Sequence, residues 1–352
     1  ALLHKRPTGF RVQSGARFWS SKEDTLFEQI KLWSEHLTAV PESAATPKSP
    51  KHPRPVPAVY DVPTSVVVSV SGGMDGSACA IWARQRWPNT HLILWHAHIA
   101  EMDWDETDQQ LAETARVIGN CTLVVVQALY RLDGTVTPAD ANGTTLVGLR
   151  IVRHGEAYFG PAPVSGDPAE ILTLLDFALK ARNGAPPTSK IRWCTSYFKA
   201  AACNRWLRDN KNVLGERCVL LTGERHAESS GRSKLPASQW RFGTKEWDVL
   251  WHRPVLSWKW HEVVSASVNA GVPLHVGYFA QGETLAAMLD ANRDERGRAR
   301  ISCVCCIFSH QHHIERALAA APQAVRPKIK AVQRYEQETG FTWQQRGAMV
   351  KC

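Results

Sequence analysis

The feature that most constrains this chain is a short glycine-containing loop that follows a strand-like run. Residues 64–71 read TSVVVSVS, a β-branched sequence typical of a strand buried on both faces. The next residues, Ser71-Gly-Gly-Met-Asp-Gly-Ser77, lead directly into a helical pattern. Glycines allow successive backbone N–H groups to converge on an anion, and a helix N-terminus adds positive potential. The sequence therefore predicts an anion-binding loop, with a tight glycine turn and a capping Asp75 as the alternative.

The side chains of this loop narrow the prediction. Ser71 and Ser77 carry hydroxyls that can donate to phosphate oxygens, and Asp75 suggests either Mg²⁺ or a structural hydrogen bond. A Walker A loop is excluded, because the GxxxxGK[ST] spacing is absent.

The rest of the chain alternates between strand-like and helical patterns, which predicts right-handed crossovers and a mostly parallel, doubly wound α/β sheet. Residues 133–168 interrupt this rhythm and predict an inserted hairpin or loop. Residues 1–63 are expected to form a basic arm, a helix over 22–40 and a Pro-rich linker. The further expected strands are His91–Ile99, Thr122–Gln127 and Cys218–Thr222, and the expected helices are Ser77–Trp87, Thr107–Gly119, Pro168–Arg182, Lys199–Asn210 and Ile314–Thr339.

Charge and cysteine usage limit the partners and the compartment. The 352 residues carry a formal net charge of +9, which favours anionic partners such as nucleotides or nucleic acid. No run approaches 18 consecutive apolar residues, so we expect no membrane span. The nine cysteines are unevenly clustered, which indicates metal ligands in a reducing cytosol rather than a disulfide framework, and we expect a cytoplasmic protein. The basic residues 1–21 also resemble a transit peptide in composition, although a basic arm is the favoured interpretation.

Several segments together resemble a known family. The loop resembles the SGGxDS motif of PP-loop (N-type) ATP pyrophosphatases, with Gly76 where that motif has its first Ser. Later segments resemble the phosphoadenosine phosphosulfate (PAPS) reductase family in the expected order, from about residue 64 to 350. They are HAHIAEMDWDET at 96–107, RWCTSYFK at 192–199, TGERHAESSGRSK at 222–234, HRPVLSW at 252–258, GVPLHVGY at 271–278 and GFTW at 340–343.

The resemblance implies an adenine nucleotide alpha hydrolase-like fold, with a PP-loop domain over 64–302 and a cysteine-containing helical region over 303–352. It also implies catalytic roles for Asp75, Arg225 and Arg232 in an enzyme that takes ATP with Mg²⁺, or an adenine sulfonucleotide. The nucleotide-binding residues implied are Ser71, Gly72, Gly73, Asp75, Gly76, Ser77, Arg192, Lys199, Gly223 and Glu228.

The cysteines predict a metal centre. Cys303 and Cys306 have CxxC spacing, and Cys194 lies far upstream. Family members that bind a [4Fe–4S] cluster use such a distal pair with a proximal cysteine, so the resemblance implies a cluster on these three. Cys305 or Cys203 is a candidate fourth ligand, and an open iron is the remaining alternative. A zinc site involving His310, His312 or His313, and unbound thiols, are the competing interpretations.

Two enzymatic functions fit this pattern. We expect an ATP pyrophosphatase that adenylates a substrate in sulfur transfer, such as DNA phosphorothioation or tRNA thiolation, with a cysteine desulfurase as sulfur donor and further partner subunits. The alternative is a sulfonucleotide reductase releasing sulfite, which is weakened because the family's C-terminal Glu-Cys-Gly motif is absent and the chain ends Met349-Val-Lys-Cys352. A catalytically silent nucleotide-binding subunit is the third interpretation.

Overall fold

We describe the fold from a computed structural model of the chain. The described residues are 55–99, 101–132, 144–153, 156–159, 172–188, 190–242, 247–294 and 298–343. They all belong to one compact unit, residues 44–352. The expected basic arm, the expected helix over 22–40 and Cys352 lie outside the described residues.

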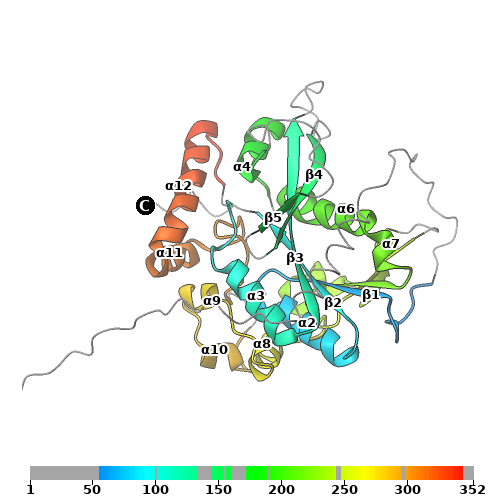
Figure 1. Ribbon diagram of the computed structural model, residues 1–352. Coiled ribbons are helices and arrows are strands. Elements are labelled where there is room, and N and C mark those ends of the chain that lie inside the picture. The colour runs from blue at the N-terminus through cyan, green and yellow to red at the C-terminus, as the bar shows by residue number, and fades with distance from the viewer. Residues whose placement is uncertain are drawn as a thin grey trace, which may run out of the picture. The chain divides into compact units, whose positions relative to one another are not determined.

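The described strands form one sheet in the order β5-β4-β3-β2-β1-β6-β8-β7. Figure 1 labels the strands β1 to β5 of this sheet. Strands β3, β2, β1, β6 and β8 are parallel neighbours, while β4, β5 and β7 pair antiparallel at the two edges. The predicted α/β class with a mostly parallel sheet is therefore confirmed. The strands span Ser65–Ser69 (β1), Leu92–His98 (β2), Cys121–Leu132 (β3), Thr144–Arg153 (β4), Glu156–Phe159 (β5), Cys218–Leu221 (β6), Ser238–Trp240 (β7) and Leu250–His252 (β8).

The order of the central strands creates a switch point beside β1. The chain moves from β1 to β2 and β3 in one direction, and it later returns to place β6 on the opposite side of β1. In open α/β sheets the loops at the carboxyl ends of such neighbouring strands diverge and leave a binding crevice between them. The loop at 71–77 follows β1, so it lies at this point of the sheet.

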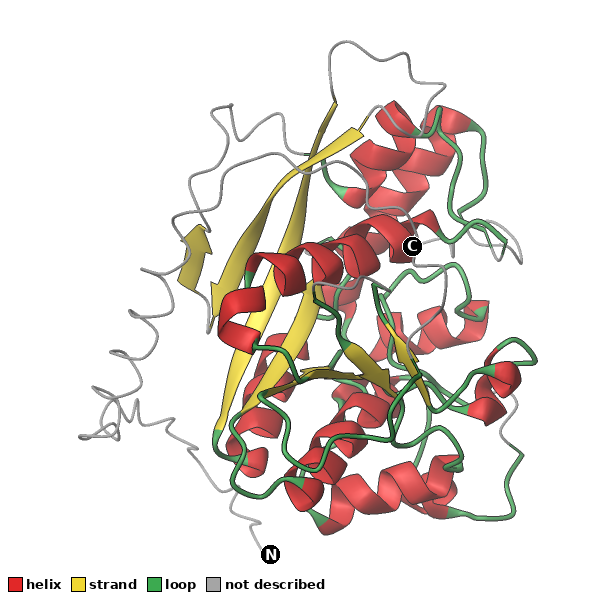
Figure 2. Cartoon of the chain, turned by 90° about the vertical axis from the view of Figure 1, so that its right-hand side faces the viewer, coloured by secondary structure: helices red, strands yellow, loops and turns green. Residues whose placement is uncertain are grey.

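The central strands are buried on both faces, as their apolar sequences predict. Val66 and Val68 of β1 belong to a core that includes side chains of the helices α2, α3 and α8, and Val67 between them is equally buried. The second face is covered by the helical stretch 193–209, which contacts β2 and β3. Helices accordingly lie both in front of and behind the strands (Figure 2).

The helices and helical turns differ from the expected ones in several bounds. They span Met74–Arg86 (α2), Thr107–Ile118 (α3), Leu174–Asp176 (α4) with a π turn Phe177–Ala181, Trp193–Thr195 (α5) with a π turn Ser196–Ala201, Ala202–Asp209 (α6), Lys211–Leu214 (α7), Trp260–Asn269 (α8), Val276–Ala280 (α9), Leu285–Leu289 (α10), Gln311–Ala320 (α11) and Pro322–Thr339 (α12), with 3₁₀ turns at His226–Glu228 and Arg232–Lys234. No described helix is long and apolar enough to span a bilayer.

Two expectations about these elements need correction, and the structure adds detail to a third. The single helix predicted over 314–339 is two helices, because Ala321 precedes Pro322 and leaves the helical region, with φ −136° and ψ 63°. The helix predicted from Lys199 begins at Trp193. The insertion predicted at 133–168 contributes β4 and β5, which extend the sheet by antiparallel pairing from a longer β3.

Candidate functional site

The loop at 71–77, predicted to bind phosphate and called the phosphate loop below, contains one glycine in a conformation that other residues rarely adopt. Gly72 has φ +73°, and a Cβ at this position would lie 3.0 Å from Cδ2 of His275. Gly73 has φ −80°, so of these two adjacent glycines only Gly72 has a positive φ. The reason for glycine at 73 is space, because its Cβ would lie 3.3 Å from the Tyr278 hydroxyl.

Helix α2 presses closely against the strand that precedes the loop. A Cβ on Gly76 would lie 3.0 Å from Cα of Val70 and 3.1 Å from the carbonyl oxygen of Ser69. This contact explains why glycine replaces the serine of the SGGxDS motif here. Ser77 is buried, and its hydroxyl donates to the Gly73 carbonyl at 3.4 Å. A phosphate contact by Ser77 stays a prediction that requires this bond to be exchanged.

The first N–H group of α2 has a hydrogen-bond partner that was not among the predicted site residues. The Met74 N–H donates to the Tyr278 hydroxyl at 3.1 Å. Tyr278 is buried, and its burial raises the pKa of its phenol, so the hydroxyl keeps its proton. Because 204 residues separate the two partners, no local pattern in the sequence could indicate this contact.

The loop after β6 meets the phosphate loop at backbone contact. A Cβ on Gly223 would lie 2.7 Å from the carbonyl carbon of Asp75 and 2.8 Å from its oxygen. Two residues later, Arg225 Nε donates to Asp75 Oδ1 at 2.6 Å. The Arg225 side chain is 2 % exposed and that of Asp75 is 28 % exposed. Burial raises the pKa of Asp75, and the Arg225 guanidinium opposes that rise.

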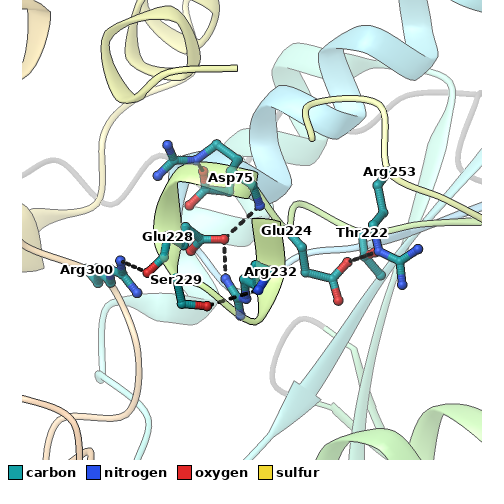
Figure 3. A network of polar contacts seen from close by, with 9 residues as sticks. Asp75, Thr222, Glu224, Glu228, Ser229, Arg232, Arg253 and Arg300 are labelled. Atoms are coloured by element: carbon teal, nitrogen blue, oxygen red, sulfur yellow. Dashed lines mark hydrogen bonds and ion pairs between the residues drawn. The ribbon is translucent and has the colours of Figure 1, made fainter. Parts of the chain in front are cut away.

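Glu228 organises the arginines on the outer side of this loop (Figure 3). Its buried carboxylate accepts from the Arg225 backbone N–H at 2.8 Å and also from the Arg232 guanidinium. The Arg300 guanidinium donates to the Glu228 backbone carbonyl at 3.1 Å. The three predicted residues Arg225, Glu228 and Arg232 are therefore brought together beside Asp75, and Arg300 joins them without having been predicted.

A second buried ion pair lies at the carboxyl end of β6. Arg253 Nε donates to Glu224 at 3.0 Å, and its guanidinium lies 4.1 Å from the centre of the Trp251 ring. Thr222 also donates to Glu224 (Figure 3). The Arg253–Glu224 pair holds the loop that carries Gly223 and Arg225 in place, so these two side chains position that loop and do not contact a ligand themselves.

The predicted metal-binding cysteines come together from distant segments. Cys194 lies in the first turn of the helical stretch 193–209, and Cys303 and Cys306 lie in the loop before α11. Cys194, Cys306 and Lys199 lie near enough to affect the titration of Cys303. The Lys199 ammonium donates to the Cys303 sulfur at 3.8 Å. Burial raises the pKa of Cys303 to about 12, and Lys199 opposes this.

The cysteine loop is fastened to the loop that follows β2. The Val304 N–H donates to the Met102 carbonyl at 2.7 Å, and Trp104 Nε1 donates to the Ser302 carbonyl at 3.0 Å. Trp343 Nε1 donates to the Cys305 carbonyl at 2.9 Å, which ties the predicted GFTW segment to the same loop. These bonds account for the late aromatic residues as structural supports of the cysteines.

The two candidate fourth ligands differ in their placement. Cys305 lies within the cysteine loop, where its side chain is 1 % exposed. Cys203 follows Cys194 by nine residues on one helical stretch, which places it roughly 13 Å further along the axis. Cys203 lies instead near Cys218 and Arg241, so the structure does not bring it to the other thiols.

The predicted anion-binding residues do not all lie together. Arg225 and Arg232 flank the phosphate loop, whereas Lys199 lies among the thiols. Arg192 is exposed, with its guanidinium 5.0 Å from the centre of the Phe308 ring, two residues after Cys306. The predicted set is thus divided between a phosphate-loop side and a cysteine side.

The fold and the site together describe an open α/β sheet with a glycine-containing loop at its switch point. No family model and no curated protein matches the chain. The chain is similar to the crystal structure of PAPS reductase from Candida auris in its phosphate complex, with 12 % identity, a TM-score of 0.33 and coverage of 60 % of this chain and 75 % of that chain. At this level of identity and TM-score, only the geometry of the residues themselves bears on what the site can do.

Proposed function

We propose that this chain is an ATP pyrophosphatase that adenylates a substrate oxygen, with release of pyrophosphate, in a sulfur-transfer reaction. The observation that supports this proposal best is the junction of two loops at the switch point of the sheet. The phosphate loop at 71–77 and the arginine-bearing loop at 222–232 touch through Gly223, and the Asp75–Arg225 pair connects them.

The loop chemistry suits a polyphosphate. Gly72 and Gly73 directly precede α2, and the N–H groups and the dipole at the start of such a helix attract anions. Arg232 and Arg300 add guanidinium groups, which pair well with phosphate oxygens. Mg²⁺ would accompany the phosphates, with Asp75 as the carboxylate within the loop.

The proposed reaction has two balanced steps. A substrate oxygen attacks the α-phosphorus of ATP and forms an adenylate, while the bond to the β-phosphate breaks and pyrophosphate leaves. A sulfur nucleophile then displaces AMP from the activated substrate. In this proposal Arg225 and Arg232, which pair with Asp75 and Glu228, would stabilise the charge that develops on the leaving pyrophosphate.

We propose that Cys194, Cys303 and Cys306 hold a [4Fe–4S] cluster, which would bind or deliver sulfur when present. Thiolates two residues apart can bind one corner of such a cluster, while a distant cysteine binds another. Because burial raises the pKa of Cys303 to about 12, binding would also release its proton.

The acceptor is proposed to be nucleic acid. The net charge of +9 favours a polyanionic substrate, and the sequence resemblance to the PAPS reductase family, whose relatives include DNA phosphorothioation proteins, points the same way. A cysteine desulfurase and further subunits would be the partners that supply sulfur.

The decisive experiment measures pyrophosphate release from ATP by anaerobically purified protein, with and without DNA, RNA or a sulfonucleotide. Gly73→Val fills the space between the loop backbone and the Tyr278 hydroxyl, and it should abolish pyrophosphate release. Valine can adopt the φ of −80° found at this position, so the loss would come from the filled space and not from backbone strain. Gly231→Ala is the matched control, because a Cβ there meets nothing within 4 Å. Sulfite production from a sulfonucleotide without ATP consumption would instead establish the reductase function.

A further inference from the structure

Two histidines and an aspartate meet at the carboxyl end of β2, outside the residues assigned above. His96 and His98 are two residues apart on the strand, so their side chains leave the same face of the sheet. Asp103 returns from the following loop, where its Oδ2 accepts from the Ile99 N–H at 2.8 Å. One ligand atom from each of the three residues lies within 4.8 Å of the other two.

The hydrogen bond on the far side of His96 determines which ring nitrogen carries the proton. His96 Nδ1 lies 3.0 Å from the Val70 carbonyl oxygen, which can only accept, so Nδ1 carries the hydrogen. In the neutral ring, Nε2 then presents a lone pair toward Asp103 Oδ2 at 3.3 Å. Two acceptors facing each other at this distance repel unless a cation lies between them or the ring is doubly protonated.

His98 contributes a second nitrogen to the same point. Its Nδ1 lies 3.0 Å from Asp103 Oδ2, yet it is a buried atom without an aligned hydrogen-bond partner. His96 is 3 % exposed and Asp103 is 9 % exposed, so bulk water does not satisfy these atoms. The side chains of Glu101 and Asp108 add negative charge near His98, and Lys199 is the cation near Asp103.

We propose that His96 Nε2, His98 Nδ1 and Asp103 Oδ2 bind a divalent transition-metal ion. Two imidazoles and one carboxylate suit Zn²⁺ or Fe²⁺ and leave coordination positions open for water or a substrate oxygen. The Val70 carbonyl orients His96 in the manner of an outer-shell partner of a metal ligand. Because Val70 immediately precedes Ser71, the ion would lie beside the phosphate loop. Lys199 lies near Asp103 and also donates to the Cys303 sulfur, so the cysteine loop would be a neighbour of the ion without supplying a ligand.

Co²⁺ is the probe that separates this site from the cysteines, since its spectrum reports whether thiolate is bound. The apo protein is titrated anaerobically with Co²⁺ as wild type, Asp103→Asn, His98→Gln and the control His91→Gln. His91 lies just before the same strand and bonds to Asn120 and Thr122, away from the proposed site. Asp103→Asn keeps an acceptor for the Ile99 N–H, and thermal unfolding without metal reports whether each variant is folded.

We expect one Co²⁺ per chain whose visible bands lack thiolate-to-cobalt charge transfer, present in wild type and His91→Gln. Asp103→Asn and His98→Gln should weaken this binding at least about 100-fold, with the thiolate bands unchanged. Zn²⁺ should compete for the same site and raise the unfolding temperature of wild type more than that of Asp103→Asn. Equal Co²⁺ binding by wild type and Asp103→Asn would overturn the proposal. A wild type without the thiolate-free bands would do the same, and His96 and Asp103 would then form an ion pair.

Discussion

The contact between Gly223 and the phosphate loop leads to the sharpest prediction about the site. A Cβ at Gly223 would lie 2.7 Å from the carbonyl carbon of Asp75, and ordinary contacts begin near 3.4 Å. Gly223→Ala must therefore move the two loops apart by about 0.7 Å. Both nearest neighbours are backbone atoms, so a side-chain rotation cannot relieve the overlap, and overpacking of this kind costs about 1–3 kcal/mol. The same displacement lengthens the 2.6 Å bond between Arg225 and Asp75.

Gly231→Ala is the matched control for this substitution. Gly231 has φ −69° and ψ −41°, and a Cβ there meets nothing within 4 Å. The control should be neutral or stabilise the protein by about 0.4–1 kcal/mol. Urea unfolding and ATP titration of both variants provide the assay, and Gly223→Ala should lose both stability and at least tenfold in ATP affinity. If the two variants match in both measurements, the two loops do not form one binding unit.

Three further predictions concern charge, thiols and pH. Asp75→Ala removes the carboxylate partner of the Arg225 guanidinium, which is 2 % exposed. The free energy of unfolding measured in urea should therefore fall by about 3 kcal/mol. If Asp75 served only to bind a ligand, this free energy would not change. Serine substitution of Cys194, Cys303 or Cys306 should remove the air-sensitive brown absorbance of anaerobic protein. Cys203→Ser should keep this absorbance. Burial lowers the pKa of His275 to about 4, and its Nδ1 accepts a hydrogen bond from the Gly277 N–H. As pH decreases, the imidazole of the unfolded chain is therefore protonated before that of the folded chain. The free energy of unfolding should fall by about 3 kcal/mol as pH decreases from about 6.5 to 4. His275→Gln should flatten that pH dependence in urea unfolding, and an equal slope would contradict the assignment.

The local patterns of the sequence predicted the elements around the site well. A β-branched run, a glycine loop and a helical pattern predicted β1, the phosphate loop and α2, although α2 begins at Met74, three residues before the predicted Ser77. The central strands were predictable because they are buried on both faces and so lack polar alternation. The end of α11 at Ala321 could also have been predicted, since Pro322 disfavours a helical conformation in the residue before it.

The contacts that build the site were not predictable in the same way. Gly223 and Gly76 are glycines because of backbone approach, and nothing in their local sequence distinguishes them from turn residues. Tyr278 reaches Met74 across 204 residues, and Trp104 reaches Ser302 across 198. The grouping of Cys194 with Cys303 was expected from the family resemblance alone, and the iron–sulfur cluster itself stays a prediction.

These long-range contacts connect the cysteine loop to the phosphate loop in a few steps. Trp104 donates to the Ser302 carbonyl beside Cys303, and its ring packs edge-on against His275 with centroids 5.9 Å apart. His275 in turn lies where a Cβ on Gly72 would touch it at 3.0 Å. A change in the cysteine loop can therefore reach the first glycine of the phosphate loop through packed side chains, and coupling of this kind acts equally in both directions.

Trp104→Phe tests this connection because it keeps an aromatic ring while removing the donor to Ser302. The half-buried Ser302 carbonyl loses one hydrogen bond, which costs about 1 kcal/mol, so the fold should survive. In wild type we expect ATP to bind several-fold more tightly to cluster-loaded protein than to protein stripped of iron by a chelator. In Trp104→Phe this ratio should approach one, because the cysteine loop no longer holds the indole against His275. Calorimetric ATP titrations of both forms measure the ratio directly. A ratio of one in wild type would show that the two loops are independent, and an unchanged ratio in Trp104→Phe would show that their coupling runs through other residues.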